Sequence, residues 1–202
     1  MKRIPDLIII LFMMAILGCS DEQSQAEQDP PKKEKETRSE NLKKFMGEFQ
    51  RYVLAGDNEL SIDYGRSLFP TQETFEMACT FEKDSEGYQL ISEWIRTTKP
   101  RNAKNYLKIY PFRAWQTEII VTSMTGAELA SSTDKSVGFH EEAGALARAG
   151  LLRSDQEFFS VDFRKSGDQV GQRYELFVWD SERKRWKMLG PIWRALSHSK
   201  KN

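Results

Sequence analysis

His140 and the two glutamates that follow it are the residues whose types best fit acid–base chemistry or metal binding. Imidazole changes its charge near physiological pH, so a histidine beside Glu141 and Glu142 could act as a general base or a metal ligand. The spacing is poor for a metal, because two ligands on one helix face are four residues apart and these are adjacent. We favour the alternative that His140 caps the following helix at the surface, and we expect no metal site and no cofactor.

A second group of candidates combines aromatic and basic side chains between residues 104 and 115. Tyr110, Arg113 and Trp115 could recognise a sugar, a peptidoglycan fragment or an acidic ligand through stacking and cation–π contacts. Ordinary packing of a strand and a loop is the alternative that we favour for this stretch. We keep Tyr110, Arg113, Trp115 and His140 as candidate ligand-binding residues and assign no catalytic residue.

Common catalytic and nucleotide-binding signatures do not occur in the sequence. It contains no nucleophile elbow, Walker loop, paired cysteine motif or dinucleotide fingerprint. Dispersed polar residues such as Tyr64, Asp162 and His140 are the groups that an enzyme could use. We therefore favour a non-catalytic binding or interaction domain with a small-molecule or protein ligand, and keep a small enzyme as the alternative.

Residues 1–18 have the pattern of a secretory signal peptide. Lys2 and Arg3 give a positive start, and an uninterrupted apolar run follows over residues 7–17. A membrane-spanning helix needs ~20 apolar residues, so this run is too short for one.

The end of the apolar run, Ile16-Leu17-Gly18-Cys19, resembles the lipobox of bacterial lipoproteins. The resemblance implies that the signal is cleaved between Gly18 and Cys19, that Cys19 is acylated on sulfur, and that the lipid holds the protein on a membrane. Ser20, where an aspartate would imply retention in the inner membrane, implies delivery to the outer membrane. We expect a cell-envelope protein with a lipid anchor facing the periplasm. An ordinary cleaved signal peptide with a chance cysteine is the alternative.

The sequence after the cysteine cannot form a core. Residues 20–38 hold six acidic and four basic residues, two adjacent prolines, and Ala26 as their only hydrophobic residue. We expect a disordered polar tether over residues 19–38, a single globular domain over residues 39–196, and a disordered basic tail over residues 197–202.

Charge and cysteine content narrow the functional classes. Removal of residues 1–18 leaves 28 Lys and Arg against 29 Asp and Glu, and this near-neutral balance argues against a nucleic-acid partner.

If Cys19 carries lipid, Cys79 has no cysteine with which to form a disulfide. Its apolar neighbours predict that Cys79 is buried in the core, and a nucleophilic thiol is the less favoured interpretation.

Hydrophobic spacing predicts helices first and strands later. The last three strands should form an antiparallel meander, because the connections between them are too short for crossovers. Such an order is typical of an α+β fold in which helices cover one face of the sheet. We expect helices near residues 40–56, 60–68, 71–81, 88–95 and 141–152, and strands near residues 117–122, 159–163, 174–179 and 186–189.

Two segments are similar to NTF2-like (SnoaL-like) cone-shaped domains: L-F-P-T-Q-E-T-F at residues 68–75, and Y-E-L-F-V-W-D at residues 174–180 with R-W-K-M-L-G-P-I-W-R at residues 185–194. The resemblance implies N-terminal helices packed on a curved antiparallel sheet that encloses a pocket. Such pockets serve either binding or lyase and isomerase chemistry, and no catalytic residue can be carried over to this sequence. Trp186 and Trp193 should anchor the last strand and its exit to the helices, and ligand contact is the less favoured interpretation of both.

Overall fold

The computed structural model describes residues 30–132 and 138–198. Apart from residues 30–34, these belong to one compact unit. The predicted signal peptide, Cys19 and the first part of the predicted tether lie outside the described residues. No helix in the described part of the chain is long and apolar enough to cross a membrane.

The first described helix, α2 (Pro30–Ala55), begins earlier than the sequence analysis predicts. Thr37 and Glu40 have the spacing of a capping box, which predicts a helix start at Thr37. Thr37 is instead inside the helix, so residues 30–38 of the predicted tether are helical. Most residues in this stretch are Lys, Glu and Arg, which have high helix propensities and need no core to continue a helix. The predicted end is confirmed, because Gly56 follows the helix with a φ of 73°.

Three further helices follow where the sequence predicts them: α3 (Asn58–Leu68), α4 (Gln72–Ala78) and α5 (Glu86–Thr98). Each has a side chain at its N-cap that accepts a hydrogen bond from the first turn, and these caps are Asp57, Thr71 and Ser85.

The remaining helices are shorter. The first of them, α6 (Ala103–Ile109), replaces the strand and loop expected there, so that prediction was wrong; Asn102 caps the helix, a signal that the hydrophobic pattern did not reveal. The others are α7 (Gly126–Ser131), α8 (Glu141–Arg148) and α9 (Trp193–His198). Helix α9 includes the first two residues of the predicted tail, whereas residues 199–202 lie outside the described residues.

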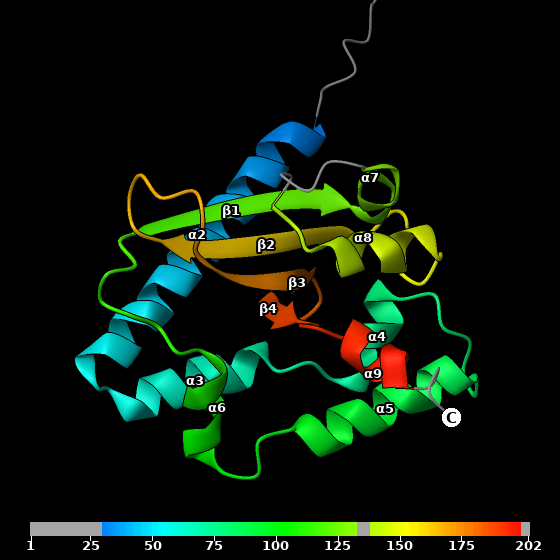
Figure 1. Cartoon of the computed structure of the whole chain (residues 1–202), viewed down its shortest axis with the longest axis horizontal. Coiled ribbons are helices and arrows are strands. Elements are labelled where there is room, and N and C mark those ends of the chain that lie inside the picture. The colour runs from blue at the N-terminus through cyan, green and yellow to red at the C-terminus, as the bar shows by residue number, and fades with distance from the viewer. Residues whose placement is uncertain (1–29, 133–137, 199–202) are drawn as a thin grey trace, which may run out of the picture. The chain divides into compact units, whose positions relative to one another are not determined.

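Four strands form one antiparallel sheet, as Figure 1 shows. They are β1 (Glu118–Thr125), β2 (Glu157–Arg164), β3 (Gln172–Asp180) and β4 (Arg185–Met188), in the order β1-β2-β3-β4. The predicted α+β class and the meander of the last three strands are therefore confirmed, and β1 extends the meander by one strand.

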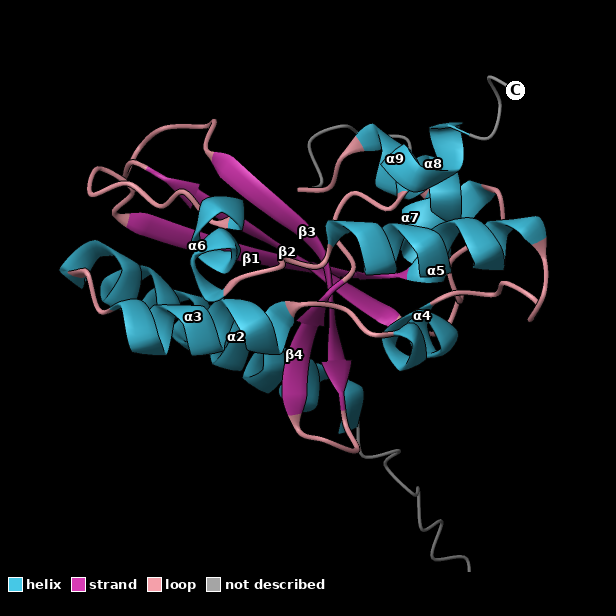
Figure 2. Cartoon of the chain, turned by 90° about the horizontal axis from the view of Figure 1, so that it is seen from below, coloured by secondary structure: helices cyan, strands magenta, loops and turns pink. Residues whose placement is uncertain are grey.

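Helices lie on both sides of this sheet. Figure 2 shows α2, α3 and α6 gathered on one side and α4, α5, α7, α8 and α9 on the other. The expectation that helices cover only one face was therefore wrong. Ser160 and Asp162, which alternate with the phenylalanines of β2, are accordingly only 2% and 8% exposed, so the polar face of this strand is covered as well.

The first core lies between α2 and the sheet and is filled with aromatic rings. Leu42, Met46 and Phe49 follow one face of α2 and are fully buried. The ring centroid of Phe49 lies 5.0 Å from that of Tyr110 and 5.2 Å from that of Phe112. Such edge-to-face contacts add to the free energy gained by burial.

Trp186 joins the last strand to α2, as predicted. Its side chain is 2% exposed, and its indole N–H donates to the side-chain oxygen of Asn41 at 2.8 Å. The Trp186 ring also meets Phe159 of β2 edge-on, with centroids 5.0 Å apart. The predicted anchoring role is therefore confirmed for Trp186.

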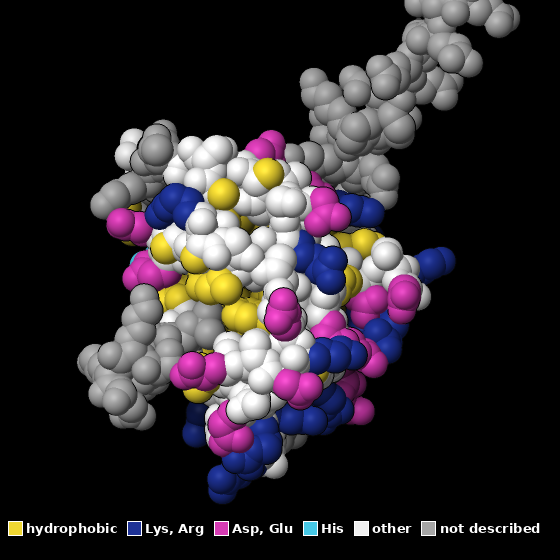
Figure 3. Space-filling view, turned by 90° about the vertical axis from the view of Figure 1, so that its right-hand side faces the viewer, with side chains coloured by type: hydrophobic (Ala, Val, Ile, Leu, Met, Phe, Trp, Pro, Cys, Tyr) yellow, Lys and Arg dark blue, Asp and Glu magenta, His cyan; other side chains and the backbone are white. Residues whose placement is uncertain are grey.

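The second core lies on the opposite side of the sheet and includes Cys79. The Cys79 side chain is 3% exposed, which confirms the predicted burial. Burial raises the pKa of its thiol to about 12, so the reactive thiolate is disfavoured. Trp193 packs against the same core with part of its ring exposed. On the face of the molecule where α5 and α9 lie, hydrophobic side chains gather in a central patch bordered by charged ones (Figure 3).

A β-bulge divides β3 into two parts. Phe159 of β2 pairs with Phe177, but Val161 pairs with Tyr174, so Glu175 and Leu176 together face one residue of β2. Leu176 takes up the extra length with a φ of 58°. The alternation of the sequence predicts that Tyr174, Leu176 and Val178 share one face of the strand. This is wrong for Tyr174, which lies in the same core as Phe177, whereas Leu176 and Val178 lie in the other core.

Replacement of Phe49 by alanine should strongly destabilise the domain. Phe49→Ala removes a fully buried ring that contacts other aromatic rings, and such a truncation costs about 3–5 kcal/mol. The matched control Leu54→Ala removes a 46% exposed side chain from the same helix and should change the free energy of unfolding by less than about 0.5 kcal/mol. Urea unfolding followed by circular dichroism measures both, and similar losses in the two variants would contradict the described core.

Candidate ligand-binding cleft

A cleft of about 810 Å³ lies where several elements end. Its walls come from the end of α6, the start of α8, the loop between β2 and β3, the first half of β3, and the connection from β4 to α9. Ligand sites commonly have volumes of about 300–1,000 Å³ and combine an apolar lining with a few polar groups. This cleft has such a lining, with apolar Ile109, Val170 and Met188 beside charged residues.

Glu175 is the most unusual group in the cleft wall. Its side chain is 8% exposed, and its Oε2 atom has no hydrogen-bond partner among the described residues. Burial raises the pKa of the carboxyl, while the backbone N–H of His140, which donates to it, and the nearby charges of His140 and Arg173 act in the opposite direction. The negative charge of Glu142 also raises the pKa of Glu175. A buried carboxylate oxygen without a donor is costly, and such groups are characteristic of functional sites.

Asp162 and Arg173 form a cross-strand ion pair beside Glu175. Arg173 Nη2 lies 3.5 Å from Asp162 Oδ2, and the two residues are direct partners in the β2–β3 register. Asp162 Oδ1 is buried and has no hydrogen-bond partner among the described residues. Gly171 packs its backbone against this carboxylate so closely that an added Cβ would collide with it. One nitrogen of the Arg173 guanidinium thus contacts Asp162, while the side chain also lines the cleft.

His140 lines the cleft in the position that the sequence suggests but without the expected contact. It is the N-cap residue of α8, yet its side chain makes no capping hydrogen bond. Instead, its Nδ1 atom contacts the Glu142 carboxylate, and its ring stacks on Trp193 with centroids 5.7 Å apart and planes 14° from parallel. The two rings therefore form a stacked aromatic pair in the cleft lining.

The other predicted ligand-binding residues do not join His140. Tyr110 is 1% exposed in the first core, with its hydroxyl 3.9 Å from Met188 Sδ. Arg113 and Trp115 lie in the loop before β1, where Trp115 is 52% exposed. The structure therefore places one of the four predicted residues in the cleft.

The dispersed polar residues considered for an enzyme are also apart. Tyr64 belongs to the aromatic core on the α2 side, where its hydroxyl donates to Glu48 at 2.8 Å. Burial and Glu48 raise the pKa of Tyr64 to about 12. Asp162 lies between Val161 and Phe163, which face that core, so its side chain projects from the other face of β2.

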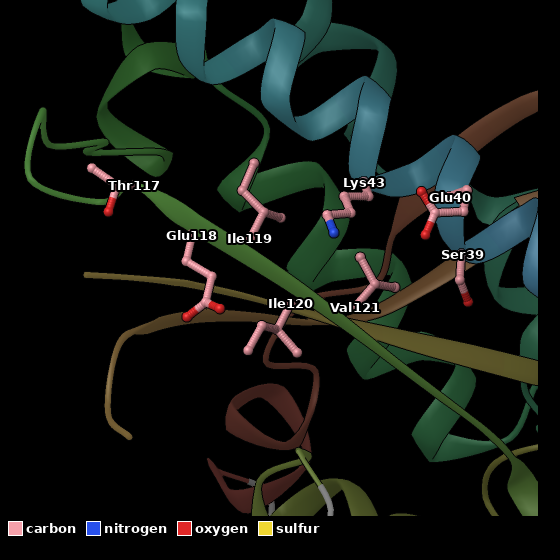
Figure 4. Close-up of a pocket in the computed structure, with 8 residues that line it drawn as sticks. All are labelled: Ser39, Glu40, Lys43, Thr117, Glu118, Ile119, Ile120 and Val121. Atoms are coloured by element: carbon pink, nitrogen blue, oxygen red, sulfur yellow. The ribbon is translucent and has the colours of Figure 1, made fainter. Parts of the chain in front are cut away.

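A second cavity of about 370 Å³ lies between α2 and the edge strand β1. Figure 4 shows Ile119 and Val121 of β1 pointing toward α2, where Glu40 and Lys43 lie, while Ile120 points to the other side of the strand. None of the eight residues labelled there has a buried polar atom without a partner. This groove therefore offers less specific chemistry than the cleft at Glu175.

Lys187 is a buried cation outside the cleft. It is 3% exposed, and its ammonium donates to the backbone oxygen of Phe69 at 2.9 Å, which joins β4 to the end of α3. Burial lowers the pKa of Lys187 to about 8. The hydrogen bond to Phe69 gives this lysine a structural role.

Glu175 escaped the sequence analysis although a signal for it exists. It interrupts the apolar run Tyr174-Glu175-Leu176-Phe177-Val178, and a charge within a buried strand marks a constrained position. The hydrophobic pattern of the sequence does not predict the bulge that places Glu175 in the cleft wall.

Within residues 30–132 and 138–198, no three His, Cys, Asp or Glu side chains come together in a way that would hold a metal ion.

Comparison of the chain with models of known protein families, with curated proteins and with solved structures finds no match in any of the three. Function is therefore inferred from the cleft itself. The cleft offers a carboxylate oxygen of Glu175 as a hydrogen-bond acceptor and the stacked rings of His140 and Trp193 as an aromatic surface.

The raised pKa of Glu175 predicts a pH-dependent contribution to stability. Folding raises this pKa above its ordinary 4.5, so the folded state holds the proton more tightly than the unfolded state. The contribution of Glu175 to the free energy of unfolding is therefore fully present below pH 4.5 and is lost as the pH rises through the raised pKa.

Glu175→Gln removes this titration, so its stability relative to the unsubstituted protein should be higher at about pH 8 than at about pH 4. Urea unfolding at both pH values measures the difference. Glu59→Gln, at an exposed position of α3, should show no such change. An equal effect of Glu175→Gln at the two pH values would contradict the raised pKa.

Proposed function

We propose that the protein is a lipid-anchored binding domain of the bacterial cell envelope and that the cleft at Glu175 is its ligand site. The observation that carries the binding role is the Glu175 carboxylate, which is buried in the wall of a large cleft with one oxygen unpartnered. A polar group in such a place is costly to the folded protein, and a bound ligand that donates a hydrogen bond offsets that cost.

The anchoring role is supported by the residues before the domain. Ile16-Leu17-Gly18-Cys19 resembles a lipobox after a signal-like apolar run, and thioether attachment of lipid to Cys19 would fix the chain to a membrane. Eleven residues, 19–29, would reach at most about 40 Å if fully extended. Ser20 favours the periplasmic side of the outer membrane.

An NTF2-like cone remains our proposal for the finer fold, but we propose that its interior is filled by side chains and does not hold the ligand. Phe49, Phe112 and Tyr110 fill the space between α2 and the sheet. A ligand site in the cleft outside this aromatic core is compatible with a cone whose interior is packed.

Acid–base catalysis is the second candidate function, and the raised pKa of Glu175 is the observation that favours it. A carboxyl with such a pKa could move a proton in a lyase or isomerase reaction. The two functions differ in the fate of the ligand: a binding domain releases it unchanged, whereas an enzyme converts it, and NMR spectra of the ligand before and after incubation distinguish them.

Mass spectrometry of the membrane-bound protein tests the anchor. We expect the amino terminus to begin at Cys19 and to carry acyl chains, because the lipobox-like sequence places the cleavage before this residue. Cys19→Ala should release the domain from membranes or leave the uncleaved precursor, whereas Cys79→Ala should not change the fractionation. An unmodified Cys19 thiol or an intact Met1 in the mature protein would contradict lipid anchoring.

A further inference from the structure

The cleft wall contains an acceptor that lacks a donor. Glu175 Oε2 is buried and has no hydrogen-bond partner among the described residues. Of the two arginines in the lining, Arg173 pairs with Asp162, and Arg194 has an interaction of its own. A ligand that brings a donor therefore satisfies the cleft, whereas a ligand that brings only acceptors leaves Glu175 unpaired.

The unpartnered oxygen of Glu175 favours a cationic donor over a neutral one. The lining holds a second carboxylate, Glu142, which contacts His140, and the guanidinium groups of Arg173 and Arg194, which have contacts of their own. An ionised carboxylate oxygen that is buried without a hydrogen-bond donor is strongly disfavoured, and a cation placed against it offsets that cost. A neutral hydroxyl would supply the hydrogen bond without the charge.

The other residues of the lining offer apolar surface to a short alkyl chain. Ile109 and Met188 line the cleft together with the stacked rings of His140 and Trp193. Val170, in the β2–β3 loop, adds a side chain that is 82% exposed. Apolar carbons of a ligand would lose contact with water on these surfaces, and a positive charge close to an aromatic face is also favoured.

We propose that the cleft binds a primary ammonium group on a short apolar chain, with its N–H donors directed at Glu175 Oε2. This proposal rests on the proposed binding function and specifies its ligand class. The group could belong to a small alkylamine or to a lysine side chain, because both present the same ammonium and methylene chemistry.

Titration of the full chain in detergent with four matched probes tests the ligand class. The probes are butylamine, butyltrimethylammonium, butan-1-ol and butyrate, followed through the NMR signal of the Trp193 indole. We expect butylamine to bind about tenfold or more tightly than each of the others, because it alone combines charge with N–H donors. Equal or tighter binding of butan-1-ol or butyrate would overturn the proposal, as would the absence of butylamine binding.

A fifth probe distinguishes the two sources of the ammonium group: lysine amide acetylated at Nα, which keeps the side-chain ammonium. Tighter binding of this probe than of butylamine supports a lysine side chain, and the reverse order supports a small alkylamine. Either order supports the ammonium class when both probes bind more tightly than butan-1-ol.

Two glutamine variants test whether Glu175 is the residue that binds the ammonium group. Glu175→Gln keeps the shape of the side chain and should weaken butylamine binding about tenfold or more, whereas Glu59→Gln makes the same charge change at an exposed position of α3 and should leave it unchanged. Unchanged binding in a folded Glu175→Gln protein would overturn the assignment. If this variant does not fold, the comparison of butylamine with butan-1-ol on the unsubstituted chain still decides the ligand class. Anchoring through Cys19 is judged separately by mass, so failure of the amine proposal is distinguishable from failure of the anchor.

Discussion

Burial of both faces of β2 and β3 is the constraint on which the rest of the structure depends. One face packs against α2 through the rings around Phe49, and the other packs against the core that contains Cys79. A sheet between two helical layers leaves little room for polar side chains, so each of them must find a partner or line a cavity. Asp162 meets Arg173, and Glu175 reaches the wall of the cleft.

The bulge in β3 reconciles these demands. An extra residue at Glu175–Leu176 lets Tyr174 and Phe177 face the same aromatic core, while Leu176 joins Val178 in the other core. Bulges bend a strand and redirect its side chains, and they are frequent beside functional sites. In this protein the bulge places the Glu175 carboxylate where the strand borders the cleft. The same bulge therefore directs apolar side chains into both cores and creates the candidate site.

Much of the fold could be predicted because it depends on local patterns. The spacing of Leu42, Met46 and Phe49 defines the buried face of α2, Thr71 caps α4, and the short turns impose the final meander. Helix α6 was missed because its seven residues are too few for a clear period. The start of α2 was misplaced because a capping-box pattern is short and can also occur within a helix.

The candidate site was less predictable because it depends on long-range packing. His140 was identified from its residue type, and it lines the cleft beside a stacked Trp193, for which the sequence favoured an anchoring role over ligand contact. Tyr110 shows the opposite case, since its aromatic and basic neighbours suggested recognition but its ring is buried in the first core. Whether a side chain lines a cavity depends on which distant segments pack around it, and spacing along the chain does not contain this information.

The central claim is that Glu175 is a buried carboxyl which a cationic ligand pairs. An NMR titration of the ¹³C-labelled Glu175 carboxyl, with and without butylamine, tests it most directly. We predict a pKa above the ordinary 4.5 in the free protein and a lower pKa when butylamine is bound, because the ammonium stabilises the ionised form. An ordinary pKa in the free protein, or a raised pKa that butylamine does not change, would contradict the account.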